Sequence, residues 1–432
     1  MVAHCWNYDC AMPTDYLVQG ATRERRERLD LLLAQSCDLP PEAAAAQTRL
    51  FFQSLDPDAA YRLADERREQ VGELDGAPAA LRYHANHLRL LAAWNSIGAM
   101  LTAGHPSQDL RTRLETLEDL LTPVTALAVG GDGQPVLVDR YRQFLSLDLD
   151  GEGKVAEVLG DLATADNVAV LLPGMGNSLE TLHDQSARGQ AIQAEAGPDT
   201  ATVVWLGYDS PDNVLQAVSK SYAYEAAPAL RRFSAGLDTE IRPDALKTLI
   251  GHSYGSVVAV NGLRHGASFD NLVLTGSPGI ARDLHSVADL DLPGVRCFVA
   301  RSPGDFIAYT QWHGVDPASY PDIVRLQTAG GVRVRFHQQY YRPNSESLRN
   351  IGRVVRGEYA AITTTDTSRE WETRLVIPGL AWGPALRAVT APVALAYDGV
   401  AALRGVTEPP RPRLIVSGRG EQVGHRPEGP SR

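Results

Sequence analysis

Apolar residues in the first part of the chain recur with the spacing of amphipathic helices. From Leu81 to Leu101 they return at every third or fourth position, matching the helical period of about 3.6 residues. Ser107 follows the helix breakers Gly104 and Pro106 and is placed to cap another helix. Earlier helices are expected over residues 23–35, 41–55 and 58–73. The pattern therefore predicts an α-helical N-terminal region over residues 1–125.

Short apolar runs replace the helical pattern after about residue 130. The turn cluster Asp-Gly-Glu-Gly at residues 150–153 separates two β-type runs and predicts a hairpin. Later apolar runs alternate with helical stretches; they are NVAVLLPG, ATVVWLG, LKTLIGH, NLVLTGS, VRCFVAR and VRVRFHQ. This alternation is typical of an α/β fold, a mostly parallel sheet with helices on both faces. We predict an α/β domain over residues 126–360, a C-terminal helical extension over 361–406, and a disordered tail over 407–432.

Two glycines flank a serine where one of these strands meets a helix. In TLIGHSYGSVV, residues 248–258, Gly251 and Gly255 surround Ser253. A tight strand-to-helix turn leaves no room for a Cβ at either glycine and exposes the central side chain. This G-x-S-x-G pattern is that of the nucleophile elbow of α/β-hydrolases. Chance is the alternative, because the chain has 38 glycines. The remaining triad members therefore decide between the two interpretations.

The acid of such a triad follows the serine in the chain. Asp305 comes after the predicted strand VRCFVAR, and Pro303 and Gly304 turn the chain between them. An aspartate at this place is also typical of a helix cap. Asp316 and Asp322 are rival acids, but no predicted strand precedes either of them. The order of elements favours Asp305.

The base of the triad follows the acid. His337 directly follows the predicted strand VRVRF, whereas His313 follows no strand and His425 lies in the predicted tail. Position therefore selects His337. The sequence predicts Ser253 as nucleophile, Asp305 as acid and His337 as base.

The loop Pro-Gly-Met-Gly, residues 173–176, lies between a strand and a helix and is a candidate oxyanion hole. Glycines let the backbone approach a substrate oxygen, and N–H groups at the start of a helix face it. One expected donor is the N–H of Tyr254, and the other is that of Met175 or Gly176. A dinucleotide-binding loop is excluded, because Leu179 stands where that motif needs its third glycine.

Tyr208 and Asp209, in WLGYDSP, end another strand at the same edge of the sheet. They are candidate substrate-binding residues, although a structural turn is an equal alternative. Residues 23–122 are expected to pack on the α/β domain. Part of them is expected near the mouth of the pocket, and packing on the far side of the sheet is the alternative.

Composition limits the partners of the protein. The 41 basic and 52 acidic side chains give a net charge of -11, which argues against nucleic acid or an anionic membrane. No run approaches the roughly 18 apolar residues of a membrane span, and the N-terminus does not look like a signal peptide. We expect a cytoplasmic protein with a small-molecule acyl substrate. The oligomeric state stays open.

The cysteines give no metal or disulfide pattern. Cys5, Cys10, Cys37 and Cys297 have neither C-x-x-C spacing nor a histidine pair at zinc-type spacing. Reduced thiols are expected. The sequence therefore predicts neither a metal site nor a cofactor.

Taken together, the motifs resemble the actinobacterial α/β-hydrolase family known as DUF1023. The matching segments are VGELDGAPAALRYHAN, TADNVAVLLPGMGNSLETL, VVWLGYDSP, LIGHSYGSVVA, VRCFVARSPGDFI, WHGVDP and HQQYYRPNSESLRNIGRVVRG. They follow the family order over roughly residues 55–357. The resemblance implies the same triad, Ser253, Asp305 and His337, on an α/β-hydrolase fold. Met175 departs from the small polar residue that is frequent there, and the family implies no substrate.

These residues predict a serine hydrolase that cleaves an ester, thioester or amide through an acyl-enzyme. One alternative is an acyltransferase or cyclase of specialised metabolism that uses the same triad. Another is a non-catalytic binding protein that has kept the hydrolase fold. The intact triad counts against the last of these.

Overall fold

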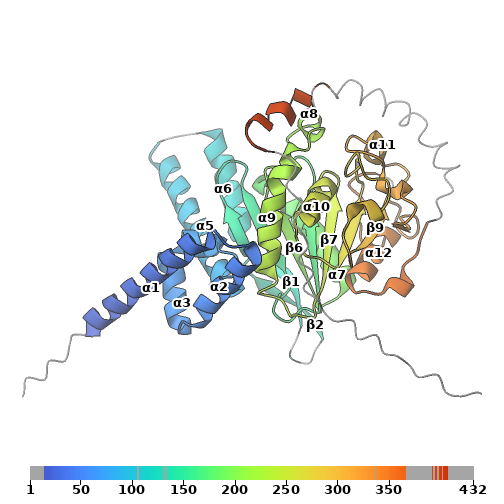
Figure 1. Ribbon diagram of the computed structural model, residues 1–432. Coiled ribbons are helices and arrows are strands. Elements are labelled where there is room, and N and C mark those ends of the chain that lie inside the picture. Colours follow the sequence, from blue (N-terminus) through green and yellow to red (C-terminus); the bar gives the residue numbers. More distant parts are fainter. Residues whose placement is uncertain are drawn as a thin grey trace, which may run out of the picture.

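An eight-stranded sheet forms the centre of the protein, with helices on both of its faces (Figure 1). The computed structural model describes residues 14–104, 107–129, 131, 134–334, 336–365 and short stretches between 392 and 406. In spatial order the strands are β10 (Val324–Leu326), β9 (Arg296–Ala300), β8 (Asn271–Thr275), β7 (Leu246–His252), β5 (Asn167–Leu172), β6 (Thr200–Leu206), β4 (Lys154–Leu159) and β3 (Gln143–Asp148).

The sheet is parallel from β6 through β5 to β10, and only β4 and its neighbours pair antiparallel. All residues of β6 are buried, as expected for a strand covered on both faces. The predicted mostly parallel sheet is confirmed. The predicted hairpin is also present, since β3 and β4 pair across the turn at residues 150–153. A separate hairpin precedes it, formed by β1 (Val124–Val129) and β2 (Pro135–Arg140).

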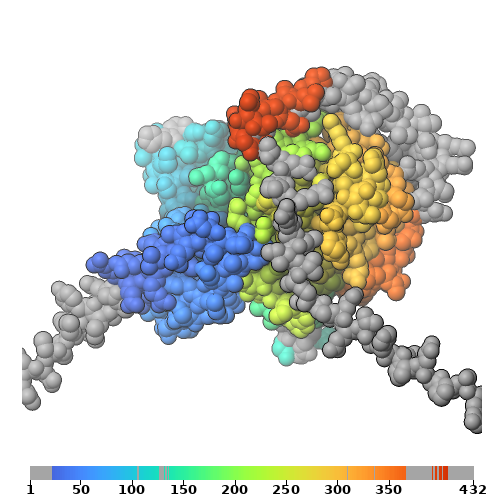
Figure 2. All heavy atoms as spheres, viewed as in Figure 1, coloured from blue at the N-terminus to red at the C-terminus, as the bar shows by residue number. Residues whose placement is uncertain are grey.

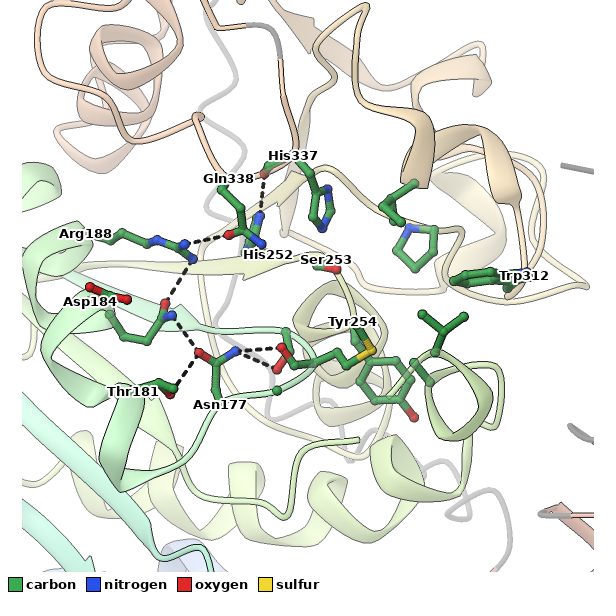
Figure 3. Close-up of a pocket in the computed structure, with 18 residues that line it drawn as sticks. Asn177, Thr181, Asp184, Arg188, His252, Ser253, Tyr254, Trp312, His337 and Gln338 are labelled. Atoms are coloured by element: carbon green, nitrogen blue, oxygen red, sulfur yellow. Dashed lines mark hydrogen bonds between the residues drawn. The ribbon is translucent and has the colours of Figure 1, made fainter. Parts of the chain in front are cut away.

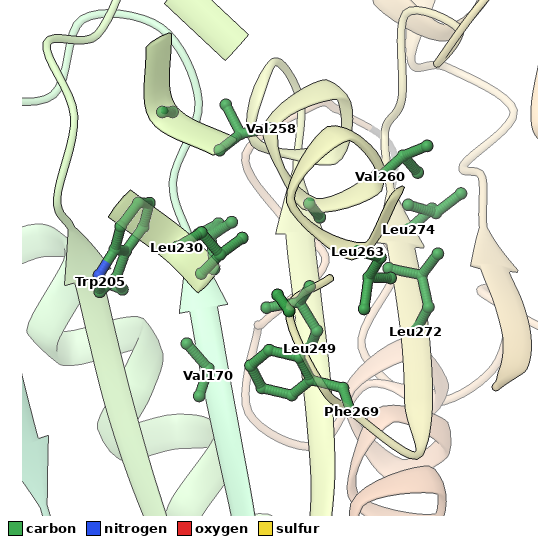
Figure 4. Packing of buried hydrophobic residues seen from close by; sticks show 14 of the residues in the cluster. Val170, Trp205, Leu230, Leu249, Val258, Val260, Leu263, Phe269, Leu272 and Leu274 are labelled. Carbon is green, nitrogen blue, oxygen red and sulfur yellow. The ribbon is translucent and has the colours of Figure 1, made fainter. Parts of the chain in front are cut away.

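Alternate residues of β5 point to opposite faces of the sheet, and each face has its own core. Val170 packs with Leu230 and Leu263 on one face (Figure 4), whereas Leu171 packs with Ile192 and other apolar residues on the other. Helices α9 and α10 thus cover the first face, and α7 and α12 cover the second. The helices of this part are α7 (Leu182–Ala196), α8 (Val214–Ala217), α9 (Ser221–Leu237), α10 (Gly255–Arg264), α11 (Phe306–Thr310) and α12 (Glu346–Val355).

The N-terminal helices form a lobe beside the sheet, drawn in blue and cyan in Figure 2. They have a hydrophobic core of their own, which includes Leu29, Leu63 and Leu81. The expected third helix is interrupted, because Arg67 leaves helical geometry with φ -124° and ψ 36°. The helices are α1 (Thr14–Ser36), α2 (Pro41–Gln53), α3 (Pro57–Glu66), α4 (Arg68–Glu73), α5 (Ala79–Thr102) and α6 (Gln108–Leu121).

This lobe is attached to the edge strand β3 and to α9. The buried amide of Asn86 donates to the carbonyl of Phe144 at 2.9 Å, so α5 is tied to the edge of the sheet. Arg49 of α2 pairs with Glu240, just after α9, at 2.5 Å. The helices therefore protect an edge that would otherwise expose unpaired backbone groups.

One predicted strand is wrong. The run VRVRF before His337 is not a strand over its described residues, and the last strand that the structure describes is instead the three-residue β10. The outer edge of β10 is occupied by the returning chain, where Thr365 N–H donates to Arg325 O at 3.0 Å. Within the run, Val332 N–H donates to Asn344 O at 3.1 Å instead of to a neighbouring strand.

The predicted C-terminal regions fall largely outside the described residues. Of the extension at 361–406, residues 366–391 are not described, and the tail at 407–432 is not described at all. A stretch within residues 392–406 lies beside α8 (Figure 1). There Asp398 accepts hydrogen bonds from Ser219 Oγ at 2.5 Å and from Lys220 N–H at 3.2 Å. Among the described residues, no helix is long and apolar enough to cross a membrane.

Candidate active site

Ser253 lies at the sharp turn between β7 and α10. Its φ of 56° is in the left-handed region, which is uncommon for a residue with a side chain. A Cβ at Gly251 would lie 2.6 Å from Ser256 Cα, and one at Gly255 would lie 2.1 Å from Leu172 O. Both contacts are with backbone atoms that cannot move away. The two glycines are therefore required by the turn, as the sequence pattern predicts.

Asp305 and His337 are in direct contact. The Nδ1 atom of His337 is 2.9 Å from Oδ2 and 3.0 Å from Oδ1 of Asp305. Asp305 is fully buried and also accepts a hydrogen bond from Ile307 N–H at 3.1 Å, which caps α11. The two interpretations of Asp305, cap and histidine partner, are thus both present. With a proton on Nδ1 facing the carboxylate, Nε2 is the basic nitrogen of His337.

The serine and the histidine line one cavity of about 350 Å³, shown in Figure 3. The Ser253 hydroxyl and the His337 ring are not hydrogen-bonded to each other in this arrangement. Such hydrogen bonds are often long without substrate and shorten when the substrate binds. The order Ser, Asp, His in the chain thus corresponds to three side chains gathered at one edge of the sheet.

His252, next to the serine, holds the loop that carries His337. Its Nε2 is 2.9 Å from the carbonyl oxygen of His337, and the two imidazole rings are 4.8 Å apart. Burial lowers the pKa of His252 well below its usual value, and the nearby His337 lowers it further. His252 is therefore neutral, and its Nε2–H donates to that carbonyl. It acts as a packed neighbour, not as a base.

The loop after β5 approaches the elbow closely. A Cβ at Gly174 would lie 2.7 Å from Ser253 Cβ and 3.1 Å from Tyr254 N, so only glycine fits there. Among the described residues, no protein group accepts from the N–H of Tyr254 or of Met175. These two backbone donors are available to a substrate oxygen beside Ser253.

The predicted oxyanion hole is corrected at Gly176, one of the two candidates for the second N–H donor. Its N–H already donates to Pro211 O at 2.9 Å, so it has no hydrogen to offer a substrate. Asn177 fixes the same loop, because its side-chain amide donates to Gly174 O at 2.9 Å and to Met175 O at 3.2 Å. With its carbonyls held in this way, the loop keeps Met175 N–H as the candidate donor.

The structure places neither Tyr208 nor Asp209 in this cavity. Tyr208 is buried, and its hydroxyl donates to Pro173 O at 2.8 Å, so it supports the oxyanion loop from behind. Asp209 is largely exposed and pairs with Lys154 at 3.1 Å. The structural-turn alternative describes this segment better than direct substrate contact.

The cavity has two chemically different ends on either side of Ser253 (Figure 3). The apolar end is that of Trp312, and the apolar side chains in the lining of the cavity include Val214, Ala217, Pro278, Ile307 and Trp312. The polar end is lined by Asn177, Thr181, Asp184, Arg188 and Gln338, together with Gln185, which is hydrogen-bonded to Asn177 and Arg188. Sequence reasoning missed both sets. The helical spacing of Thr181, Asp184, Gln185 and Arg188 after the oxyanion loop is the signal that could have found the second.

The N-terminal helices do not take part in this cavity. Every residue that lines it lies between residues 174 and 338. No residue of 23–122 lines this cavity, although Arg113 of α6 lines the adjoining hollow that shares Gly176 with it. The expected position near the mouth therefore stays a prediction. The alternative, packing on the far side of the sheet, does not describe these helices, which lie against the edge strand β3 and α9.

The rival acids and histidine have structural roles. Asp316 forms a buried ion pair with Arg301 at 2.5 Å. Asp322 accepts from Val287 N–H at 2.6 Å and from Ala288 N–H. His313 is fully buried, with Nε2 2.8 Å from a backbone carbonyl. His425 lies outside the described residues.

The two described cysteines are free thiols. Cys37 is exposed and Cys297 is buried, whereas Cys5 and Cys10 lie outside the described residues. Over the part of the chain that the structure describes, no three His, Cys, Asp or Glu side chains are grouped so that they could hold a metal ion.

Comparison with known proteins agrees with this architecture. A family model described as alpha/beta hydrolase matches residues 148–314, from the end of β3 to just beyond α11. The match includes the oxyanion loop, the serine elbow and Asp305, and it ends before His337.

Relatives occur in Mycobacterium tuberculosis. The uncharacterized protein Rv2079 is 26% identical over 393 residues, which cover 75% of this chain and 57% of that protein. The chain thus spans little more than half the length of this relative. The uncharacterized protein Rv0963c is 29% identical over 241 residues, covering 53% of this chain and 80% of that protein.

The solved structures that match are more distant. The esterase LipW from Mycobacterium marinum is 11% identical with a TM-score of 0.32, over 62% of this chain and 90% of that chain. The sheet topology and the family match carry the assignment: the chain has the α/β-hydrolase fold and is similar to an α/β-hydrolase family with mycobacterial relatives.

Proposed function

We propose that this protein is a serine hydrolase of the DUF1023 type, cleaving an ester, thioester or amide bond through an acyl-enzyme. The observation that carries the proposal is the contact between the buried Asp305 carboxylate and Nδ1 of His337, in a cavity that also holds Ser253. Binding alone does not need a nucleophile, a base and an orienting acid at one sheet edge.

In the proposed first step, Nε2 of His337 takes the proton of the Ser253 hydroxyl as the oxygen attacks the substrate carbonyl. Asp305 keeps the imidazole in the tautomer that leaves Nε2 basic and stabilises the positive ring. The N–H groups of Met175 and Tyr254 bind the oxyanion. Each such donor contributes about 3 kcal/mol of transition-state stabilisation.

In the second step, the imidazolium gives its proton to the leaving group, which departs and leaves an acyl group on Ser253. Water then attacks the acyl-enzyme with His337 again as base, and the carboxylic acid product is released. Another nucleophile in place of water would give acyl transfer or ring closure by the same residues.

A fluorophosphonate probe tests the proposal, because it labels only an activated serine. We expect one label on wild-type protein, at Ser253, and no label on Ser253→Ala. The half-buried Ser286 lies outside the cavity, so Ser286→Ala is the matched control and should label like the wild type. Unlabelled wild-type protein would contradict the proposal and favour a binding protein. Product analysis with an added alcohol or amine distinguishes hydrolysis from acyl transfer.

A further inference from the structure

Arg188 is a cation at the polar end of the cavity with only neutral partners. Its Nη1 donates to Gln185 Oε1 at 3.1 Å and its Nη2 to Gln338 Oε1 at 2.5 Å. Among the described residues it forms no ion pair, and Asp184 acts on its charge only from beyond 4.0 Å. Its remaining N–H donors have no protein partner in that part of the chain. Burial lowers the pKa of Arg188, but a guanidinium stays protonated at neutral pH.

A partly buried guanidinium that is not neutralised is a strong attractor for an anion. The favoured anion is planar and accepts two hydrogen bonds, as a carboxylate does. The two glutamine contacts hold the side chain in place and leave its charge without an ion-pair partner. Gln185 is itself fixed, since its amide donates to Asn177 Oδ1 at 2.6 Å. The cation is thus positioned before any substrate arrives.

Asp184 is the one other charged group that lines the cavity. It stands one turn before Arg188 on α7 and attracts the guanidinium electrostatically without forming an ion pair within 4.0 Å. Asp184 is exposed, so water screens its charge, whereas the guanidinium is partly shielded from solvent. The carboxylate of Asp184 therefore does not cancel the charge of Arg188 inside the cavity.

We propose that the substrate carries a carboxylate, which binds Arg188, and an apolar group, which lies between Val214 and Trp312. The reacting carbonyl lies between the two, at Ser253. This rests on the proposed function and names the class of its substrate: esters, thioesters or amides that bear a carboxylate on one side of the cleaved bond.

A purely structural role of Arg188 is the competing explanation. Its contact with Gln338 adjoins His337, so its loss could disturb the base for every substrate alike. A role in binding predicts instead a loss that depends on the charge of the substrate. Paired substrates that differ only in charge separate the two explanations.

Binding is measured first, because it needs no catalysis. In the Ser253→Ala background, calorimetry with 4-phenylbutyrate and its neutral analogue 4-phenylbutanamide compares anion with isostere. Arg188→Gln should raise the Kd of the carboxylate about 10- to 100-fold and should change the Kd of the amide by no more than about threefold. Asp184→Asn should strengthen carboxylate binding. Arg113→Gln, in the hollow next to Gly176, is the matched control. It should change the affinity for neither the carboxylate nor the amide.

Hydrolysis is measured next with two pairs of esters. 4-Butyryloxybenzoate and 4-butyryloxybenzamide place the charge on the leaving group, and monophenyl adipate and its primary amide place it on the acyl group. Arg188→Gln should lower kcat/KM about 10- to 100-fold for the anionic member of one pair only. That pair identifies the side of the bond that faces Arg188.

The two proposals fail in distinguishable ways. The carboxylate site would be overturned if Arg188→Gln lowered kcat/KM equally for charged and neutral esters. It would also be overturned if 4-phenylbutyrate bound equally well to Ser253→Ala with and without Arg188→Gln. Wild-type protein that binds 4-phenylbutyrate through Arg188 but hydrolyses no ester and takes no fluorophosphonate would leave this site standing and refute the hydrolase.

Discussion

The hydroxyl of Tyr340 donates a hydrogen bond to Oδ2 of Asp305 over 2.6 Å, the same carboxylate that orients His337. Tyr340 is fully buried, and burial raises the pKa of its hydroxyl well above the usual value. It is therefore a neutral donor at all working pH values. The same hydroxyl accepts from Ser302 N–H at 2.9 Å. The tyrosine thus links the acid to the strand end from which it projects.

Tyr340→Phe should lower both turnover and stability. The carboxylate loses a donor and the buried Ser302 N–H loses its acceptor, so the free energy of unfolding should fall by about 1–3 kcal/mol. Turnover should fall about tenfold, since one hydrogen bond to a charged group is worth roughly 1.5 kcal/mol. Denaturant unfolding and ester kinetics below the transition measure the two effects.

Tyr341→Phe is the matched control for that variant. The Tyr341 hydroxyl is hydrogen-bonded to Thr275 Oγ1 at 2.8 Å and does not touch the acid. We expect a loss of stability without the tenfold loss of turnover. Equal turnover of the two variants would show that Tyr340 does not act through Asp305.

Asp305→Asn should lower turnover, whereas Asp316→Asn should lower stability. The asparagine at 305 would leave His337 in the wrong tautomer and lower turnover by about 10⁴-fold while the protein stays folded. Asp316 is buried and pairs with Arg301, so Asp316→Asn removes the carboxylate of a buried ion pair and should cost about 3–5 kcal/mol of unfolding free energy. Turnover per folded molecule and urea unfolding measure the pair. A folded, active Asp305→Asn enzyme would reassign the acid.

Glu152, in the turn between β3 and β4, should make stability depend on pH. A hydrogen bond with Asp212, then burial and other nearby acids, raises the pKa of Glu152 from 4.5 to about 7. Between these two pH values the folded protein binds more protons than the unfolded chain, so its contribution to stability is lost as the pH rises. The effect is small, because the side chain is exposed and screened.

Glu152→Gln removes this titration. We expect the variant to be more stable than the wild type at pH 8 and to differ little at pH 4. The free energy of unfolding as a function of pH measures this. Parallel curves for the two proteins over the whole range would rule out the raised pKa.

The sequence was informative where chemistry needs a residue at a strand end. Ser253 and Asp305 follow β7 and β9, and the glycines of the elbow are dictated by backbone contacts that any such turn has. His337 was selected although the strand predicted before it is absent from the described residues of that run, because the chain order alone left few histidines. That selection, which stays a prediction, rested on the chain order and on an incorrect element.

The oxyanion donor, the position of Arg188 and the placement of the N-terminal lobe depend on contacts between distant segments, which no local sequence pattern encodes. Gly176 and Met175 look alike as donors until the bond from Gly176 N–H to Pro211 O is seen. Arg188 reads as an ordinary helix residue, and only the packing of α7 beside the loop at Gln338 brings it to the cavity. The placement of the N-terminal lobe likewise follows from its fit to β3, since an amphipathic helix does not specify the surface that it covers.

Arg142 provides the last prediction, because it joins that lobe to the sheet. Its Nε and Nη2 pair with the carboxylate of Glu157 on β4 at 2.7 and 2.9 Å, and its Nη1 reaches Asp119 of α6 at 2.9 Å. Arg142 and Glu157 are buried, whereas Asp119 is half exposed. Removal of the arginine alone leaves the buried Glu157 carboxylate without its ion-pair partner, and among the described residues only the hydroxyl of Ser186 still donates to it, which should cost about 3–5 kcal/mol of unfolding free energy.

Arg142→Met should therefore be strongly destabilised, and Arg142→Met with Glu157→Leu should recover most of the loss, because the double variant leaves no unpaired charge. Asp119→Asn is the matched control and should cost less than about 1 kcal/mol, since that carboxylate is solvated. Neither Arg142 nor its partners line the cavity, so ester turnover per folded molecule of the double variant should equal that of the wild type. A double variant that is stable but has lost its turnover would show that the lobe is coupled to catalysis and that Arg142 does not act on stability alone.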